Sequence, residues 1–456
     1  MTASVKQYLK DNRQKNLDRL KAFLAIPSVS TTSSHKQDVL KAGEFVRDYL
    51  DDIGFDTVSI EETGGHPLVY AEWMGAEGAP TALFYGHYDV QPAEPLELWD
   101  SEPFEAEIRN ERIFARGASD DKGQVFMHLA VFEAFMKTHG KLPINVKVVI
   151  EGEEEIGSAN LTPYLKNNLE KLAADFALVS DSGMVETGQP TMLYGLKGFT
   201  GLEVTLRGAK RDLHSGLYGG AVKNPAMALA QLLAGMKDEN EKVLVEGFYD
   251  SIETLDQDER DLMNAAPGED YTQSLDIPAT TPEEGFTVNE HLMARPTFEV
   301  NGIFGGYQGE GTKTIIPSEA TAKLTCRLVP GQDPTVIQDL LVEHIEKHVP
   351  KGVHVSVKRE PLSAKAYKVD PSHPLILSAA ESLSAAFGKK TVFVRLGGSI
   401  PVVESFDQLF GIPVILLGFG TPEDNLHAPN ESFPVKHFDL GMEVLADYYT
   451  KAASIS

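Results

Sequence analysis

The spacing of apolar residues along the first part of the chain predicts helices. Apolar side chains recur at roughly helical intervals from Val5 to Leu24, and Pro27 ends that pattern. A second helix is predicted over residues 38–53, because Gly54 follows the last periodic residue and is a common helix stop.

Short apolar runs follow, and one long helical run separates the third from the fourth. Strands that alternate with helices in this way indicate a largely parallel sheet covered by helices on both faces, which is an α/β fold. The predicted strands cover residues 57–60, 68–75, 81–87, 144–150 and 176–181, and the predicted helix covers residues 124–138.

The middle of the chain has a different pattern. It contains alternating strands at 194–208 and 319–330, a helix after Pro225 and a long acidic stretch from Lys237 to Glu290. We expect a smaller α+β domain there, inserted into the first domain. The predicted domains are residues 1–193 together with 369–456, and the inserted residues 194–368.

Composition and charge limit the classes of function. The chain has 456 residues, of which 42% are hydrophobic and 24% charged, as expected for a soluble protein of two domains. The formal net charge of -26 argues against nucleic acid and anionic membranes as partners, because both select basic surfaces. Cys326 is the only cysteine, so no intrachain disulfide is expected. A signal-peptide pattern and an apolar run of about 20 residues are both missing, which predicts a cytoplasmic protein.

Ionisable residues follow directly after three of the predicted strands, in the runs "FYGHYD", "VVIEGEEE" and "LVSDS". Binding residues of parallel sheets lie just past the carboxyl ends of the strands, where the loops converge. The candidate residues at these strand ends and in nearby motifs are His87, Asp89, Asp120, Asp121, Glu154, Glu155, Asp181 and His427.

Each of these residues also has an ordinary structural explanation when it is taken singly. A loop histidine such as His427 is more often a surface residue than a ligand, and the "DD" pair could cap the helix that begins near Gln124. The run "SDS" could form a turn, and "EGEEEIGS" could be solvated. Together, two imidazoles and several carboxylates at one sheet edge are the ligands that Zn²⁺ or Mn²⁺ needs.

The motifs resemble a known family from one end of the chain to the other. They appear in the family's order as "YGHYDVQP", "RGASDDKGQ", "EGEEEIGS", "SDSG", "DLHSGLYGG", "KTIIP", "CRLVP", "GGSIPV" and "HAPNE". The chain is similar to the M20 family of di-metal aminoacylases and dipeptidases, and most similar to its carnosinase-like, cytosolic dipeptidase branch. The resemblance implies a di-metal catalytic domain with an inserted lid and dimerisation domain.

Two divalent metal ions per subunit, Zn²⁺ or Mn²⁺, are implied by this resemblance. His87 would bind one ion and His427 the other, Asp120 would bridge both, and Glu155 and Asp181 would complete one shell each.

The resemblance also implies the catalytic roles. Asp89 would orient and polarise His87, and Glu154 would be the general base that takes a proton from the water between the metals. The Asp120–Asp121 peptide bond is expected to be cis.

The substrate contacts are expected from the inserted domain and from one later loop. His214 resembles the histidine that stabilises the oxyanion, which in dimeric members reaches the active site of the partner subunit, and Arg327 resembles the arginine that binds the substrate carboxylate. Thr314, Gly398 and Ser399 resemble further polar contacts to the substrate.

One position departs from the family pattern. Relatives often carry an acidic residue just before "GGSIP", and this chain has Leu396 at that position, in "RLGGSIP".

Our leading hypothesis is a homodimeric metallodipeptidase or exopeptidase that acts on small peptides. Leu396 keeps open an N-acyl-amino-acid or carbamoyl amide hydrolase, and a non-catalytic binding or scaffold protein is the alternative of another class. The roles of Glu151 and Glu153 also remain open.

Overall fold

A computed structural model describes residues 1–398 and 400–455, and the chain divides into two compact units. Two of the four unit boundaries lie within β8 (Thr191–Leu196) and β16 (Val392–Leu396), and the other two follow Lys368 and Ile400. Unit 1 comprises Met1–Tyr194, Val369–Val394 and Pro401–Ser456, and unit 2 comprises Gly195–Lys368 and Arg395–Ile400.

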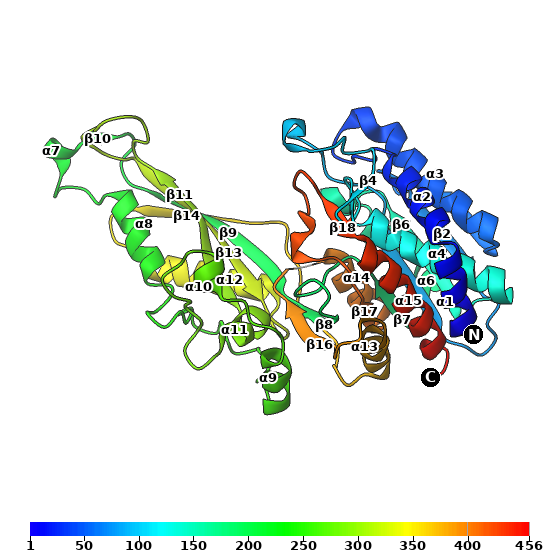
Figure 1. The fold of residues 1–456 in the computed structure, drawn as a ribbon. Helices are drawn as coiled ribbons and strands as arrows, with labels where there is room; N and C mark the ends of the chain where they lie inside the picture. The colour runs from blue at the N-terminus through cyan, green and yellow to red at the C-terminus, as the bar shows by residue number, and fades with distance from the viewer. Residues whose placement is uncertain (399, 456) are drawn as a thin grey trace. The chain divides into compact units, whose positions relative to one another are not determined.

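Unit 1 is built on a central mixed sheet. Its other strands are β1 (Thr57–Glu61), β2 (Leu68–Trp73), β3 (Thr81–His87), β6 (Asn145–Glu151), β7 (Phe176–Val179) and β17 (Val414–Leu416). They lie in the order β1-β2-β6-β3-β7-β17-β8. Figure 1 labels β2, β6, β7, β17 and β8 of this sheet. The central strands β6, β3, β7 and β17 pair in parallel, whereas β1, β2 and β8 pair antiparallel at the two sides. The predicted α/β fold with a mostly parallel core is confirmed.

Helices cover both faces of this sheet. They are α1 (Thr2–Asp11), α2 (Arg13–Leu24), α3 (Lys36–Ile53), α4 (Lys122–His139), α5 (Leu161–Asn167), α6 (Leu169–Leu172), α13 (Pro374–Phe387), α14 (Pro401–Phe410) and α15 (Val435–Ala452). Phe84 and Tyr85 are neighbours on β3, so their side chains point to opposite faces. Phe84 stacks on His128 of α4 at 3.9 Å between ring centroids, and Tyr85 packs edge-on against Phe406 of α14 at 5.7 Å. The two helices therefore lie on opposite sides of the sheet.

The first helical segment differs from the sequence prediction because Asn12 interrupts it. Asn12 lies between α1 and α2, and its side-chain amide donates to the carbonyl oxygen of Tyr8 at 2.9 Å. An asparagine that bonds to the backbone in this way competes with helix continuation. Helix α2, the latter part of this segment, ends at Leu24, just before Pro27 as predicted.

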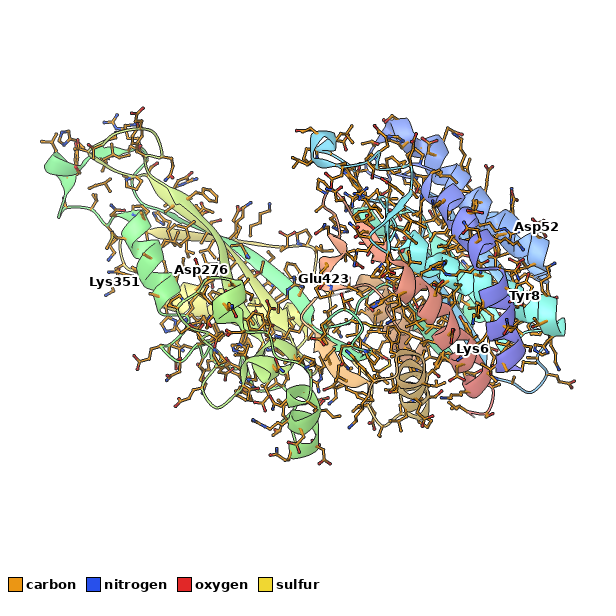
Figure 2. All side chains as sticks on the ribbon, in the orientation of Figure 1. Lys6, Tyr8, Asp52, Asp276, Lys351 and Glu423 are labelled. Carbon is orange, nitrogen blue, oxygen red and sulfur yellow. The ribbon has the colours of Figure 1, made fainter. Side chains whose placement is uncertain are left out.

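A buried carboxylate fastens these N-terminal helices to the core. Glu133 of α4 accepts hydrogen bonds from Lys15 at 2.7 Å, Arg19 at 2.6 Å, Tyr49 at 2.5 Å and Tyr8 at 3.2 Å. Its side chain is 4% exposed, and Figure 2 shows Tyr8 on α1. One carboxylate thus joins α1, α2 and α3 to α4.

Glu133→Gln is expected to lower the free energy of unfolding by about 3 kcal/mol, because it leaves two cations facing an uncharged buried group. Urea denaturation checks this value. Lys41→Gln is the matched control, since Lys41 pairs with Asp38 at the surface, where such pairs contribute roughly 0–1 kcal/mol. Equal effects of the two changes would contradict the importance of Glu133.

A small antiparallel sheet in unit 1 brings the end of the chain back to its first third. Its strands, in the order β18-β5-β4, are β18 (Ser432–Pro434), β5 (Arg112–Phe114) and β4 (Glu107–Arg109). Ser432 pairs with Phe114, and Pro434 pairs with Arg112. The segment just before β18 therefore lies beside the segment just after β5.

Short 3₁₀ turns complete unit 1. They are η1 (Ser33–His35), η2 (Leu96–Leu98), η3 (Glu154–Ile156) and η4 (Pro422–Asp424).

Unit 2 is an antiparallel sheet with helices packed on one face. The sheet order is β11-β13-β9-β14, formed by β11 (Thr297–Gly305), β13 (Glu319–Leu328), β9 (Gly198–Arg207) and β14 (His354–Arg359). Leu202, Val204 and Leu206 of β9 alternate toward a buried core, against which α8 (Pro225–Ala234) and α12 (Pro334–His348) pack. The other elements of this unit are β10 (Leu213–His214), β12 (Ile315–Ile316), β15 (Tyr367–Lys368), α7 (Ser215–Tyr218), α9 (Gln257–Asn264), α10 (Tyr271–Ser274) and α11 (Val288–Ala294).

The prediction of one continuous strand over residues 194–208 is wrong. β8 ends at Leu196, which pairs with Tyr367, and β9 begins at Gly198, which pairs with Leu328. The strand thus changes partners across Lys197, where the burial changes from both faces in β8 to mainly one face in β9. Among the described residues, no helix has both the length and the apolar character needed to cross a bilayer.

Candidate metal centre

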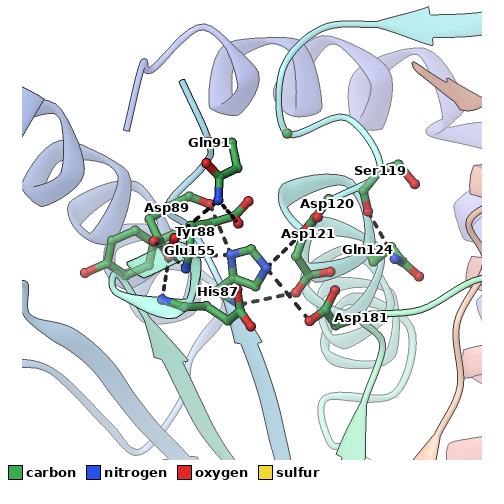
Figure 3. A network of polar contacts seen from close by, with 12 residues as sticks. His87, Tyr88, Asp89, Gln91, Ser119, Asp120, Asp121, Gln124, Glu155 and Asp181 are labelled. Atoms are coloured by element: carbon green, nitrogen blue, oxygen red, sulfur yellow. Dashed lines mark hydrogen bonds and ion pairs between the residues drawn. The ribbon is translucent and has the colours of Figure 1, made fainter. Parts of the chain in front are cut away.

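The carboxyl ends of the parallel strands in unit 1 meet at one edge of the sheet. β3 ends at His87, which pairs in register with Glu151 at the end of β6. Asp181 follows Val179, the last residue of β7, by two positions. Parallel pairing therefore places the predicted strand-end residues side by side, as Figure 3 shows for His87 and Asp181.

The first group of metal-ligand side chains surrounds His87. Its Nε2 atom lies 3.0 Å from Oδ1 of Asp120 and 4.0 Å from Oδ2 of Asp181. Ligand atoms of these three residues all lie within 4.8 Å of one another. The His87 side chain is fully buried, so its imidazole is held in place for contact with these carboxylates.

The second group shares Asp120 with the first. Nε2 of His427 lies 3.0 Å from the other Asp120 oxygen, Oδ2, and 3.2 Å from Oε2 of Glu155. His427 is more open than His87, with 53% of its side chain exposed, and its backbone has a left-handed φ of 59°. One aspartate therefore faces two imidazoles, each through a separate oxygen.

The donor set fits a pair of divalent cations. Each group combines one imidazole nitrogen with carboxylate oxygens, the ligand types of zinc and manganese sites. Burial, together with the Asp120 carboxylate, raises the pKa of Asp181 to about 7. Hydrogen bonds to Asp120 and Glu155 raise the pKa of His427 to about 10. The carboxylates lie so close together that they repel one another, and a positive charge between them is therefore favoured.

Asp89 holds the turn that carries the two candidate glutamates. Its carboxylate oxygens accept the backbone N–H groups of Glu154 at 3.2 Å and Glu155 at 3.1 Å. Nδ1 of His87 lies 3.1 Å from the Asp89 carbonyl oxygen and 3.5 Å from its carboxylate. Asp89 thus contacts the imidazole, as the resemblance implies, and also fixes the glutamate turn, which sequence reasoning missed.

Glu154 belongs to neither metal-ligand group, although it lies in the same buried region. Burial raises the pKa of Glu154 to about 8; His87 lowers it, whereas Asp181 and Glu155 raise it further. A carboxyl group with a pKa near neutrality can both accept and return a proton. Its neighbour Glu155 faces His427, so the two glutamates occupy different environments.

The other two glutamates of "EGEEEIGS" have structural partners. Glu151 accepts hydrogen bonds from the hydroxyl groups of Tyr85 at 2.6 Å and Ser158 at 2.8 Å. Glu153 accepts the backbone N–H group of His66 at 2.8 Å. Both side chains are buried, so of the alternatives left open for these two glutamates the solvated one is excluded.

Asp121 is not used as a side-chain helix cap. It occupies the N-cap position of α4, but its side chain makes no capping hydrogen bond. Its Oδ2 atom instead accepts the backbone N–H group of His87 at 3.2 Å. The Asp120–Asp121 peptide bond is cis, as expected.

A comparison with protein families decides the identity of this arrangement. Residues 83–451, which include every residue of the two groups, match the family described as peptidase family M20/M25/M40. The chain belongs to this family. The predicted M20 membership is confirmed.

Similar proteins agree with this assignment. The M20 chain is 30% identical over 460 residues to the Cys-Gly metallodipeptidase DUG1 of Candida albicans. This alignment covers 96% of the chain and 95% of the Candida protein. The solved M20 family metallo-carboxypeptidase Sso-CP2 from Sulfolobus solfataricus has 32% identity and a TM-score of 0.83, covering 96% of this chain and 99% of that one. Human carnosine dipeptidase 1 has 26% identity and a TM-score of 0.79, covering 99% of each chain. These similarities confirm the carnosinase-like branch.

Two of the predicted substrate residues of this M20 chain are brought together within unit 2. β10 pairs with β12, and the backbone N–H group of Ser215 donates to the carbonyl oxygen of Thr314 at 2.9 Å, which places Thr314 beside His214. Nδ1 of His214 accepts the N–H group of Gly216 at 3.1 Å. In the neutral imidazole this contact assigns the proton to Nε2, which can then donate. Both His214 and Thr314 are exposed.

Two further predicted substrate residues of the M20 chain, Arg327 and Gly398, are also found in unit 2. Arg327 lies on β13, half-buried, with its guanidinium carbon 5.3 Å from the centre of the Phe199 ring. Gly398 is half-buried, and Leu396 at the end of β16 is 40% exposed. Ser399 lies outside the described residues.

Sequence reasoning missed Gln91, which contacts a predicted ligand of the M20 chain. Its side-chain amide donates to Oε2 of Glu155 at 2.8 Å and to the Glu155 carbonyl oxygen at 3.2 Å. Figure 3 shows this contact beside Asp89. Gln91 stands inside the quoted run "YGHYDVQP", so the signal was its place in a long shared motif.

Proposed function

We propose that this M20 chain is a metal-dependent dipeptidase that hydrolyses the peptide bond of dipeptides or short peptides. The observation that carries the proposal is the sharing of Asp120 by two imidazole–carboxylate groups, with Glu154 beside them and in neither. The names of the Candida and human relatives, both dipeptidases, support the substrate class.

The chain's own residues divide the chemistry between them. His87, Asp120, Asp181, Glu155 and His427 would hold two ions. Bound divalent ions supply Lewis acidity, which lowers the pKa of water and stabilises developing negative charge. Glu154 accepts a proton from the attacking water and returns it to the leaving amine. Its raised pKa suits this exchange, because a carboxylate with a low pKa would take the proton from water less readily.

Residues of unit 2 are proposed to bind the rest of the substrate. His214 donates through Nε2 to the oxyanion, and the contact from Gly216 to Nδ1 supports that tautomer. Arg327 binds the substrate carboxylate through its planar pair of N–H donors. Thr314 and Gly398 provide further polar contacts.

The protein is proposed to act as a homodimer through unit 2. Leu217 on α7, Met227 on α8, and Ile303 and Phe304 on β11 are apolar and 49–75% exposed. β11 stands at one end of the sheet order, where a strand can pair with another chain. Exposed apolar side chains beside a sheet edge support an interface between subunits. A monomeric mass at micromolar concentration in sedimentation analysis would contradict it.

Zinc or manganese is proposed as the metal, and the cytoplasm as the compartment. The mixed nitrogen and oxygen ligands support the metals. Cys326 is a buried thiol, which is compatible with a reducing compartment. Metal analysis of purified protein tests the metal, and cell fractionation tests the location; calcium alone, or a secreted protein, would contradict them.

A matched substrate panel tests the dipeptidase proposal. It contains free dipeptides, the same dipeptides acetylated at the amine, and the same dipeptides amidated at the carboxyl group, each assayed with Zn²⁺ and with Mn²⁺. We expect turnover of the free dipeptides and a much lower kcat/KM for the amidated set, because amidation removes the carboxylate that Arg327 is proposed to bind.

The other outcomes separate the alternatives. Turnover confined to the acetylated set would contradict the dipeptidase proposal and favour an N-acyl-amino-acid hydrolase. No turnover and no bound metal would favour a non-catalytic binding protein. Equal turnover of free and amidated dipeptides would contradict only the role of Arg327.

A further inference from the structure

The carboxylate of Glu431 accepts hydrogen bonds from the backbone of the loop that carries Asp120. One of its carboxylate oxygens accepts the N–H groups of Ser119 at 3.0 Å and Asp120 at 3.1 Å. The other oxygen accepts the N–H group of Gly117 at 2.9 Å and Nη1 of Arg116 at 2.8 Å. The carboxylate is buried and receives four donors, which uses its full hydrogen-bonding capacity.

Arg116 extends this contact to a third loop. Its side chain is 1% exposed, and its Nη2 atom donates to the carbonyl oxygen of Pro92 at 3.1 Å. Pro92 lies in the loop that follows His87, the last residue of β3, and carries Asp89. The Arg116–Glu431 ion pair therefore joins the loop after His87, the loop of Asp120, and the loop that runs from His427 to Glu431 itself.

A second buried carboxylate, which precedes His427 in the sequence, also joins the loop of Asp120 to the loop of His427. Asp424 accepts the Ser119 hydroxyl group at 2.5 Å and the backbone N–H group of Thr421 at 2.8 Å, and it is paired with Arg112. Asp424 and Glu431 stand three residues before and four residues after His427. The exposed imidazole thus projects from a loop whose two ends are anchored to Ser119.

We propose that Glu431 is the positioning residue that fixes Asp120 between the two imidazoles, and that it acts through the backbone rather than by touching metal or substrate. The inference rests on the proposed function, because Asp120 is the residue common to both metal-ligand groups. A shift of the Asp120 backbone alters both of its carboxylate contacts, to His87 and to His427, each of which is 3.0 Å long. Glu431 therefore governs the affinity of both ions together.

A carboxylate is required for this task. An amide at position 431 keeps one acceptor oxygen but turns an NH₂ group, which only donates, toward two of the four donors. Whichever way the amide is oriented, at least two buried donors lose their acceptor, and each such loss is costly. The loop of Asp120 would then lose this attachment to the loop of His427, and the contact between Asp424 and the Ser119 hydroxyl group would not replace it at the Asp120 backbone.

The test measures metal binding to the purified full chain by calorimetric titration with Mn²⁺, and the spectrum of the loaded protein by electron paramagnetic resonance. For Glu431→Gln we expect about 10- to 100-fold weaker binding of both ions, the usual effect of losing a residue that supports metal ligands. We also expect an altered magnetic coupling between the two Mn²⁺ ions. Glu133→Gln is the matched control, because Glu133 is also a buried carboxylate paired with an arginine, and its hydrogen-bond partners Tyr8, Lys15, Arg19 and Tyr49 lie outside both metal-ligand groups. The control should lose stability but keep the metal affinities and the spectrum.

The outcomes separate this inference from the proposed function. Failure of the wild-type chain to bind two ions would overturn the proposed function. Two ions in the wild type, with unchanged affinities in Glu431→Gln, would overturn only the role of Glu431. Weaker binding of one ion alone, or an equal loss of affinity in Glu133→Gln, would also overturn it. If Glu431→Gln does not fold, Glu431→Asp is measured instead; it keeps the charge but withdraws the carboxylate from the loop, and unchanged affinity there would equally overturn the role.

Discussion

Replacing Glu154 with glutamine is expected to lower kcat about 10³-fold while both metal ions stay bound. The side chain has the same shape but can no longer accept a proton, so the loss measures general-base catalysis alone. Glu154 lies outside both metal-ligand groups, which is the reason for expecting unchanged metal content. Steady-state kinetics and metal analysis of the same sample check both halves of the expectation.

The neighbouring Glu153→Gln is the control for this change. Glu153 is buried and accepts hydrogen bonds from His66 and Asn160, so the variant should lose stability and keep its kcat. Loss of metal from Glu154→Gln would mean that the roles of Glu154 and Glu155 are reversed. A kcat within tenfold of the wild type would remove Glu154 from the mechanism.

The inactive Glu154 variant also tests whether His214 acts across a dimer. A His214→Ala chain and a Glu154→Ala chain are each expected to be inactive, and a mixture that exchanges subunits should regain part of the activity. Recovery is expected because a mixed dimer holds one site with both residues intact. Proven mixing without recovery would show that His214 serves its own chain.

Replacing Asp120 with asparagine is expected to weaken both ions and to lower kcat/KM by about 10³-fold. The change removes the charge and one of the two oxygens that face His87 and His427. The lost stabilisation of charge in the transition state is worth about 4 kcal/mol, which corresponds to that factor. Calorimetric titration with Zn²⁺ or Mn²⁺ gives the two affinities.

Asp181→Asn provides the comparison, because Asp181 belongs to the first group alone. It should weaken one ion and leave the second near its wild-type affinity. Unchanged affinities for both ions in Asp120→Asn would disprove the bridging role. If both ions are weakened equally in Asp120→Asn and in Asp181→Asn, then Asp181 also serves both sites.

The central strands β3 and β6 and the helix α4 of unit 1 could be predicted because their apolar runs are long. β3, with Thr81 and His87 at its ends, has the predicted bounds, and α4 begins only two residues before the predicted helix. The break at Lys197 could not be predicted, because the partners of a strand depend on the folded sheet and not on the strand's own residues. The interruption at Asn12 depends on one side-chain hydrogen bond, which composition does not reveal.

The metal-facing residues could be proposed from the sequence because strand ends and long motifs mark them. Most of the contacts that hold them could not. Glu431 acts on the backbone of Ser119 across more than three hundred positions, and Asp89, whose contact with His87 the resemblance implied, also accepts the backbone N–H groups of Glu154 and Glu155. Backbone partners carry no pattern in the residue types, so only the folded arrangement identifies such contacts.

The order of these residues along the chain also determines how the protein matures during synthesis. His87, Asp120 and Asp181 emerge from the ribosome within the first 181 residues, whereas His427 and Glu431 follow only after the whole of Gly195–Lys368 has been made. Domains fold as the chain emerges, N-terminal parts first. A nascent chain made only as far as Lys368 therefore carries His87, Asp120 and Asp181 of the first metal-ligand group but lacks the histidine of the second.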